Sequence, residues 1–257
     1  MGVGGPRFLR EDPLTGVVVI LMLAVSCGPI SQPGSAPRAA ANSPAMRPLE
    51  SCVQTSDMAR EVSFKSSNGE EVIGAVLGDG NVGVTMAHGA QSDLCEWLPY
   101  AKRLRDMGRR VLIIDFNLDL VGDVVGAADE LRREGVSRVV LVGSSMGATA
   151  SLVAATVSAP PVAGVASLSA PQQYSTMDAL AASKQLTVPV LYMAGRTDQQ
   201  RPYDFPADAK TMYAACPSTR KQLLILPGND HGSDLLAGNA ADQARSALEK
   251  FIADATA

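Results

Sequence analysis

The chain has 257 residues, which is enough for one or two domains. Its formal net charge is −4 and only 4% of its residues are aromatic, so it lacks the basic surface and the stacking platforms of nucleic-acid-binding proteins. Hydrophobic residues make up 46% and charged residues 19%, a balance that excludes a disordered chain and a membrane protein with many spans.

The N-terminus carries a hydrophobic run, Leu14–Ser26, that is shorter than the roughly 20 residues of a membrane-spanning helix. Its length is typical of a signal peptide. Cys27 follows directly, and Leu23–Cys27 resembles a bacterial lipobox, in which the cysteine becomes lipidated. We therefore expect a signal peptide over residues 1–27, a flexible tether over 28–57, and an exported domain anchored to the bacterial cell membrane. An uncleaved anchor helix and ordinary secretion are the alternatives, and both also export the domain.

Export makes disulfide bonds possible. If Cys27 is acylated, then Cys52, Cys95 and Cys216 remain, which allows one pair and one free thiol. We expect the pair Cys52–Cys95, because it would tie the segment that enters the domain to the first helix. Cys216 is then interpreted as a small apolar residue near a helix end.

Apolar periodicity along residues 58–257 predicts strands and helices in alternation. The first half is expected to hold a hairpin of strands at 61–66 and 72–77, a buried strand at 82–87, a helix at 94–107, a strand at 111–116 and a helix at 121–133. The second half is expected to hold strands at 138–143, 162–169, 188–194 and 221–226, and helices at 146–157, 177–186, 207–215 and 240–255. This pattern predicts an α/β fold, with a mostly parallel, doubly wound sheet and helices on both faces. The connections are too short for a cap domain, so we expect an open site.

The motif Gly143-Ser-Ser145-Met-Gly147 lies between an apolar strand and an Ala-rich helix. A G-x-S-x-G motif in this setting is typical of a nucleophile elbow, a sharp turn that raises the serine Oγ above the end of its strand. Glycines are needed because side chains two residues before and after the serine would collide. The helix N-terminus then directs backbone N–H groups at a developing oxyanion. The alternative is an ordinary Gly/Ser turn.

A nucleophilic serine needs a general base and an acid that orients it. The chain has two histidines, and His231 follows the predicted strand 221–226 in a loop that would carry it over the sheet. Asp198 follows the strand 188–194 and is our candidate for the acid. Asp204, in the same loop, is the runner-up, and Asp230 is interpreted as local loop structure. The alternative for His231 is a histidine in a surface loop.

The segment His88-Gly89-Ala90 also follows a buried strand. We expect the backbone N–H groups of Ala90 and Met146 to form an oxyanion hole. Gly89 lets the backbone pass close to a substrate. His88 is interpreted as a structural, hydrogen-bonded histidine in preference to a second base.

From about residue 61 to residue 252 the chain resembles the α/β-hydrolases, of the small capless type that includes dienelactone hydrolases and related esterases. The matching residues are His88-Gly89, the Gly143–Gly147 motif, Asp198 and His231, in this order and each after a strand. The resemblance implies Ser145 as nucleophile, His231 as base and Asp198 as acid. The chain departs from many relatives at Ala148 and in the loop 117–122, and its oxyanion loop is not of the HGGG type.

The sequence has no HExxH motif, no CxxC pair and no Walker A loop, so neither a metal nor a cofactor is expected. Gly78–Gly83 matches the glycine pattern of dinucleotide-binding loops, but strand sequence follows it where a helix is required.

The sequence thus predicts a serine hydrolase that cleaves a carboxylic ester, thioester or lactone through an acyl-enzyme. Its expected partner is a small ester substrate, with no nucleic acid and with membrane contact only through the N-terminal lipid. The loops 117–123, 170–176 and 198–205 are expected to form the pocket walls. Because a fold does not fix a function, the alternative is an inactive hydrolase-fold lipoprotein that acts as a binding or envelope protein.

Overall fold

The computed structural model describes Gly2 and residues 52–257, and residues 52–257 belong to a unit that spans Met46–Ala257. The predicted lipidation site Cys27 and the predicted tether up to residue 51 lie outside the described residues. Over the part of the chain that is described, no helix has both the length and the apolar character needed to cross a membrane.

The centre of the fold is a sheet of eight strands in the order β1-β2-β4-β3-β5-β6-β9-β12. The strands are β1 (Ala59–Lys65), β2 (Glu71–Leu77), β3 (Val82–Ala87), β4 (Arg110–Asp115), β5 (Arg138–Ser144), β6 (Gly164–Leu168), β9 (Val190–Gly195) and β12 (Lys221–Leu226). Strand β2 pairs antiparallel with both of its neighbours, and all other pairs are parallel. The mostly parallel sheet that the sequence predicts is therefore confirmed.

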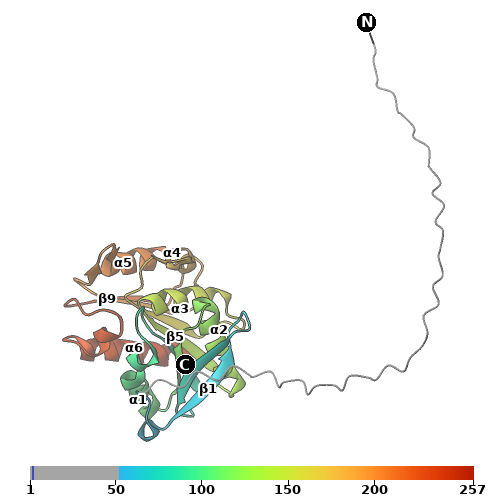
Figure 1. Ribbon diagram of the computed structural model, residues 1–257. Helices are drawn as coiled ribbons and strands as arrows, with labels where there is room; N and C mark the ends of the chain where they lie inside the picture. Colours follow the sequence, from blue (N-terminus) through green and yellow to red (C-terminus); the bar gives the residue numbers. More distant parts are fainter. Residues whose placement is uncertain (1, 3–51) are drawn as a thin grey trace, which may run out of the picture. The chain divides into compact units, whose positions relative to one another are not determined.

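Helices cover both faces of this sheet, as predicted (Figure 1). One face carries α2 (Leu120–Arg133), α3 (Met146–Val157), α4 (Ala179–Ser183) and α5 (Phe205–Ala215), and the other carries α1 (Leu98–Asp106) and α6 (Ala241–Thr256). Strand β5 shows why both faces need cover, because Val139 and Leu141 belong to one buried cluster and Val140 and Val142 to the other. A strand that is apolar at every position has to be buried on both sides.

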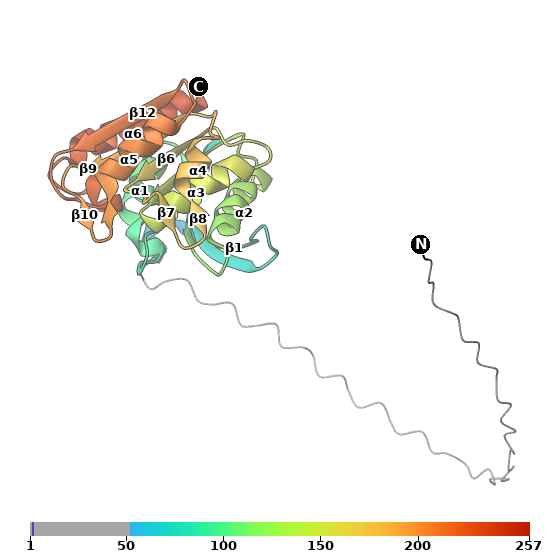
Figure 2. The same cartoon turned by 90° about the horizontal axis from the view of Figure 1, so that it is seen from above.

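Two short hairpins, β7–β8 and β10–β11, project from the same side of the domain (Figure 2). They comprise β7 (Gln173–Tyr174), β8 (Met177–Asp178), β10 (Gln199–Gln200) and β11 (Tyr203–Asp204). Each pairs a glutamine with an aspartate: the Gln173 amide donates to Asp178 Oδ2 at 3.4 Å, and the Gln199 amide to Asp204 Oδ2 at 2.8 Å. Each aspartate also caps the helix that follows.

These hairpins differ from the sequence expectation, which placed loops at 170–176 and 198–205 and a helix over 177–186. Strands of two residues are too short to show an alternating pattern. The helix α4 is correspondingly shorter than expected, because Asp178 pairs in β8 and its carboxylate accepts from the N–H of Ala181 at 2.7 Å.

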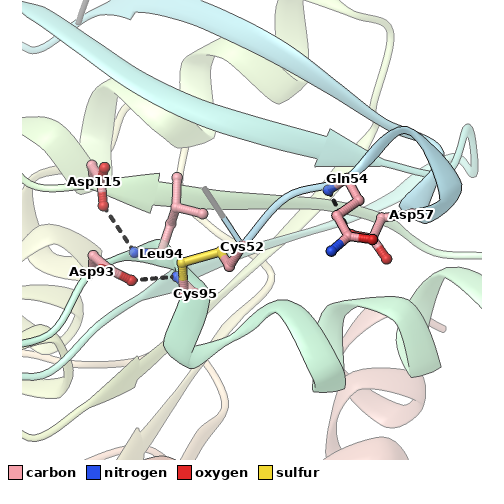
Figure 3. The surroundings of a disulfide bond; sticks show 7 residues. All are labelled: Cys52, Gln54, Asp57, Asp93, Leu94, Cys95 and Asp115. Carbon is pink, nitrogen blue, oxygen red and sulfur yellow. Dashed lines mark hydrogen bonds between the residues drawn. A yellow bond between two sulfur atoms is a disulfide. The ribbon is translucent and has the colours of Figure 1, made fainter. Parts of the chain in front are cut away.

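A disulfide joins Cys52, at the start of the domain, to Cys95, and their Cα atoms are 5.9 Å apart (Figure 3). Cys95 lies in the 3-10 helix η2 (Leu94–Glu96), and its N–H donates to Asp93 Oδ1 at 2.8 Å. The 3-10 helix η1 (Thr55–Asp57) follows Cys52, and the Asp57 carboxylate pairs with Lys102 Nζ of α1 at 2.7 Å. Residues 52–57 are therefore part of the folded domain, which extends it ahead of the expected start at residue 58.

The Cys52–Cys95 bridge closes a loop with a sequence separation of 43. For a loop of that size, constraint of the unfolded chain is expected to contribute about 4 kcal/mol. We predict that the double variant Cys52→Ser/Cys95→Ser loses roughly this much stability in urea unfolding. Dithiothreitol should destabilise the wild-type chain to a similar extent and leave the double variant unchanged; equal stability of the two chains would contradict the prediction.

Asp123 in α2 has a fully buried carboxylate, on the face of the sheet that α2, α3, α4 and α5 cover. Its Oδ2 accepts a hydrogen bond from the N–H of Asn117 at 2.8 Å. Burial raises the pKa of the Asp123 carboxyl above its ordinary value, and the Asn117 N–H opposes this only in part. The folded state therefore binds this proton more tightly than the unfolded state does.

The consequence is a loss of stability as pH rises from the unfolded-state pKa of Asp, about 3.9, through the raised folded-state value. Asp123→Asn removes the buried charge and keeps an oxygen for Asn117. We expect this variant to gain stability over wild type at neutral pH, and the gain to disappear below about pH 4. Urea unfolding of both chains across this range measures the difference, and a gain that does not depend on pH would contradict it.

Candidate active site

The predicted site residues all follow strands of the parallel sheet. Ser145 comes directly after β5, Asp198 follows β9, and His231 follows β12 in the loop that leads into the 3-10 helix η3 (Gly232–Leu236). Because parallel strands end at the same edge of a sheet, the topology carries these residues to that edge. Ligands bind at this edge in open α/β sheets.

Ser145 occupies the sharp turn between β5 and α3. Its backbone has φ 51° and ψ −113°, a left-handed conformation that residues other than glycine rarely adopt. The turn is fixed on both sides, since the Ser145 N–H donates to the Leu168 carbonyl at 2.8 Å and its carbonyl accepts from the Thr149 N–H at 3.1 Å. Such strain persists only where the surrounding structure imposes it, and it clusters at functional sites.

Glycines on both sides of Ser145 allow this turn. A Cβ atom at Gly143 would lie 2.2 Å from the Gly147 carbonyl oxygen, and one at Gly147 would lie 2.3 Å from the Ala87 carbonyl oxygen. The first contact closes the turn on itself, and the second packs the start of α3 against the end of β3. Neither backbone can move away without breaking a strand or a helix.

We predict that Gly147→Ala destabilises the protein by at least ~3 kcal/mol or prevents folding, because the new methyl group meets backbone atoms that cannot yield. Gly89→Ala is the matched control: its Cβ would have no neighbour closer than 3.4 Å, so its cost should stay below ~1 kcal/mol. Thermal or urea unfolding compares the two, and equal stability of both variants would contradict the steric argument.

His231 and Asp198 are in direct contact. Nδ1 of His231 lies 3.0 Å from Asp198 Oδ1 and 2.9 Å from Oδ2, so its proton is shared between both carboxylate oxygens. Asp198 is buried, and the His231 side chain is 23% exposed. A proton on Nδ1 leaves Nε2 of the neutral ring as an acceptor, which is the arrangement a general base requires. The ring of Phe205 packs on the imidazole with centroids 4.4 Å apart.

The loop that carries His231 contacts the turn that carries Ser145. The contacts are made by residues next to His231 and next to Ser145 in the chain. The N–H of Ser233 donates to Ser144 Oγ at 3.2 Å. Gly232 passes over the same hydroxyl so closely that a Cβ there would lie 2.1 Å from it, and its φ is 57°. The Gly232 N–H also donates to Ser169 Oγ at 3.0 Å. These bonds bring the histidine loop against the turn that holds Ser145.

The segments that carry the expected oxyanion donors, Ala90 and Met146, adjoin Ser145. Met146 is the first residue of α3, so its N–H is among those that have no acceptor within the helix. Gly89 adjoins Ser145, since a Cβ there would lie 3.6 Å from Ser145 Cβ. Its own N–H donates to Glu96 Oε2 at 2.8 Å, which holds the loop that presents Ala90.

His88 is buried and forms two hydrogen bonds of its own. Nδ1 lies 2.7 Å from the Gly89 carbonyl oxygen, and Nε2 accepts from the N–H of Phe116 at 3.3 Å. Both ring nitrogens are thus occupied by backbone groups. This arrangement agrees with the structural, hydrogen-bonded role expected for His88.

The runner-up acid, Asp204, is occupied elsewhere. Its Oδ1 accepts from the N–H of Ala207 at the start of α5, and its Oδ2 from the amide of Gln199. The Asp230 carboxylate lies against Gly238, where a Cβ would come within 2.0 Å of Oδ2.

Cys216 is a buried free thiol, as its sequence position suggested. Among the described residues, no group of three or more His, Cys, Asp or Glu side chains is placed to hold a metal ion.

Sequence reasoning missed the residues that support the site: Ser144, Ser169, Gly232 and Phe205. Ser169 follows the carboxyl end of β6, a position where a polar residue in a parallel sheet is a signal for function. The contact between Phe205 and His231 joins two loops and has no local signal.

No protein-family model and no curated protein sequence matches the chain. Its structure is similar to that of an esterase from Pyrococcus furiosus, with TM-score 0.65, 15% identity, and coverage of 76% of this chain and 92% of that one. A dienelactone hydrolase from Anabaena variabilis is similar with TM-score 0.61, 22% identity, and coverage of 74% and 95%. An esterase from Thermogutta terrifontis gives TM-score 0.60, 16% identity, and coverage of 75% and 99%.

The chain has an α/β-hydrolase fold. In this fold the loops after the strands build the site. The two short hairpins and the first turns of α4 and α5 line an open cavity of about 550 Å³. Its lining includes Gln172, Leu180, Tyr203 and three carboxylates, Asp178, Asp204 and Asp208. Burial raises the pKa of the Asp208 carboxyl. Five of the residues that line the cavity, Gln172, Gln173 and Pro202–Asp204, lie in the segments 170–176 and 198–205, which the sequence predicted as pocket walls.

Proposed function

We propose that this protein is a serine hydrolase that cleaves carboxylic esters, thioesters or lactones through an acyl-enzyme. Ser145 is the nucleophile, His231 the general base and Asp198 the acid that orients it. The observation that carries the proposal is the contact of His231 Nδ1 with both oxygens of the buried Asp198 carboxylate, at 3.0 and 2.9 Å. The strained backbone of Ser145, with its φ of 51°, is a second observation that supports the proposal.

The first half of the reaction forms the acyl-enzyme. Ser145 Oγ attacks the carbonyl carbon while its proton passes to Nε2 of His231. The ionised Asp198 stabilises the imidazolium that results. The carbonyl oxygen becomes an oxyanion and accepts hydrogen bonds from the N–H groups of Ala90 and Met146. His231 then gives the proton to the leaving oxygen or sulfur, and the carbon–oxygen or carbon–sulfur bond breaks.

The second half uses water as the nucleophile. His231 takes a proton from water, hydroxide attacks the acyl carbon, and the same two N–H groups hold the second oxyanion. The bond to Ser145 Oγ breaks, Oγ recovers its proton from His231, and the carboxylic acid leaves. Atoms and charges balance without a metal or a cofactor.

The acidic cavity beside the hairpins suggests which substrates are disfavoured. Asp178, Asp204 and Asp208 place carboxyl groups along its wall, and its lining residues Tyr203 and Asp204 directly precede Phe205, which packs on His231. A substrate with a carboxylate or phosphate directed into this cavity would be repelled. Neutral esters are therefore the first substrates to test.

We also propose that the domain is exported and held at the bacterial membrane by lipid on Cys27. The hydrophobic run and lipobox-like sequence support this proposal. The Cys52–Cys95 bridge is consistent with it, because disulfides persist mainly in oxidising compartments. Several acyl chains on one cysteine would bind the membrane stably.

Treatment of the full chain with a fluorophosphonate tests the mechanism without a known substrate. We expect a covalent adduct on Ser145, located by peptide mass spectrometry, and its absence in Ser145→Ala. Against p-nitrophenyl esters, Ser145→Ala and Asp198→Asn should each lose ~10³-fold or more in kcat/KM, with the fold retained.

The outcomes separate the competing functions. A folded protein without any adduct would contradict the hydrolase proposal and favour an inactive hydrolase-fold binding protein. An adduct on Ser144 would show that the serine assignment in the turn is wrong by one residue. Circular dichroism of each variant establishes that it is folded.

A further inference from the structure

Ser169 lies where three strand ends of the site meet. It follows β6 directly, is fully buried, and its N–H donates to the Met193 carbonyl of β9 at 2.8 Å. Its φ is 54°, so a serine occupies a backbone conformation that glycine or asparagine adopts more readily. An observed departure of this kind is a reason to look for a function.

The hydroxyl of Ser169 makes two hydrogen bonds. Its Oγ lies 2.7 Å from Asp198 Oδ2 and 3.0 Å from the backbone nitrogen of Gly232. A backbone N–H can only donate and an ionised carboxylate can only accept. The single hydroxyl proton therefore points at Asp198, and an oxygen lone pair receives the Gly232 N–H.

This bridge sets the geometry of the acid and the base together. The Asp198 carboxylate is held by Ser169 on Oδ2 and by His231 on both oxygens, which fixes the plane of the carboxylate. The Gly232 N–H belongs to the residue directly after His231, so the same hydroxyl also fixes the backbone that carries the imidazole. One side chain thus joins β6 to the loops after β9 and β12.

We propose that Ser169 is a positioning residue for the Asp198–His231 pair, a role that rests on the proposed function. Its hydroxyl holds the imidazole in place for proton transfer and disperses the charge of Asp198 through a second hydrogen bond. Misplacement of a catalytic group by about 1 Å costs roughly 100-fold in rate, so a small displacement of His231 is enough to matter.

Removal of the hydroxyl has two expected effects. The loop of His231 loses an anchor, which slows proton transfer from Ser145. Asp198 loses a donor, so its charge acts more strongly on His231 and favours the imidazolium. In a plot of rate against pH, the rise that marks deprotonation of His231 should therefore move to higher pH. A serine with a purely structural role would leave that rise in place.

The experiment uses Ser169→Ala and Ser169→Gly in the full chain. Both remove the hydroxyl, and the glycine variant also relieves the left-handed backbone, so it is expected to fold if the alanine variant does not. Ser175 provides the matched control, because it has the same φ of 54° but lies exposed in the turn between β7 and β8 and is not among the residues that line the cavity. Ser175→Ala and Ser175→Gly repeat the backbone changes away from the acid and the base.

The first readout is the rate of fluorophosphonate labelling of Ser145 as a function of pH. We expect both Ser169 variants to react ~10-fold or more slowly than wild type on the high-pH plateau. We also expect their labelling rate to rise at a higher pH than that of wild type. Both Ser175 variants should match wild type in the plateau rate and in the pH at which the rate rises.

The second readout is NMR titration of the histidine Cε1–H signals. The chain has two histidines, so His88 serves as an internal reference for His231. We expect the His231 midpoint to rise in both Ser169 variants and that of His88 to stay unchanged. The charged groups that neighbour the acid and the base remain in every variant. Asp230 and Asp234 flank His231 in the chain, Arg196 and Asp204 flank Asp198 between β9 and α5, and Glu96 shares a cavity with Asp234.

Two results would overturn the proposal. One is a wild-type labelling rate and His231 midpoint in the folded Ser169 variants. The other is a slower plateau rate with no shift in the pH at which the rate rises or in the His231 midpoint, which would make Ser169 a structural residue only. If wild type itself is not labelled at any pH, the hydrolase proposal fails, and the NMR midpoints alone then decide whether Ser169 acts on His231.

Discussion

The close approach of backbone to backbone at the turn after β5 organises the rest of the structure. Gly147 sits against the carbonyl of Ala87, where a Cβ would be 2.3 Å from the oxygen, so α3 begins directly beneath the end of β3. This contact forces Ser145 into a left-handed conformation and sets it beside Gly89. A side chain on a rigid turn keeps its position relative to the backbone N–H groups around it, which the proposed stabilisation of an oxyanion requires.

Two serine hydroxyls hold the loop that carries His231, one at the end of β5 and one directly after β6. Ser144 receives the N–H of Ser233, and Ser169 receives the N–H of Gly232 while donating to Asp198. Loops are the most variable parts of a fold, and sites built on them depend on such attachments. The Cys52–Cys95 bridge acts in a similar way on the other side, because it restrains η2, whose Glu96 holds the N–H of Gly89.

Much of the fold followed from periodicity. Strands β3 and β12 and helix α3 have the bounds that the sequence predicted, because a continuous apolar run or a long Ala-rich segment leaves little choice of structure. The hairpins β7–β8 and β10–β11 did not follow, because two-residue strands held by Gln–Asp side-chain pairs carry no periodic signal. The same hairpins supply two of the three carboxyl groups of the cavity wall, Asp178 and Asp204, so its charge was also beyond sequence reasoning.

The sequence by itself determined the α/β architecture and the identity of the candidate nucleophile, base and acid. Each of these depends on local order along the chain: a strand, a turn with its glycines, or a polar residue after a strand. Only the tertiary structure placed Ser169 between Asp198 and Gly232 and the Phe205 ring on His231. Those contacts join segments far apart in the chain, and the distance between such segments is decided by how the helices pack on the sheet.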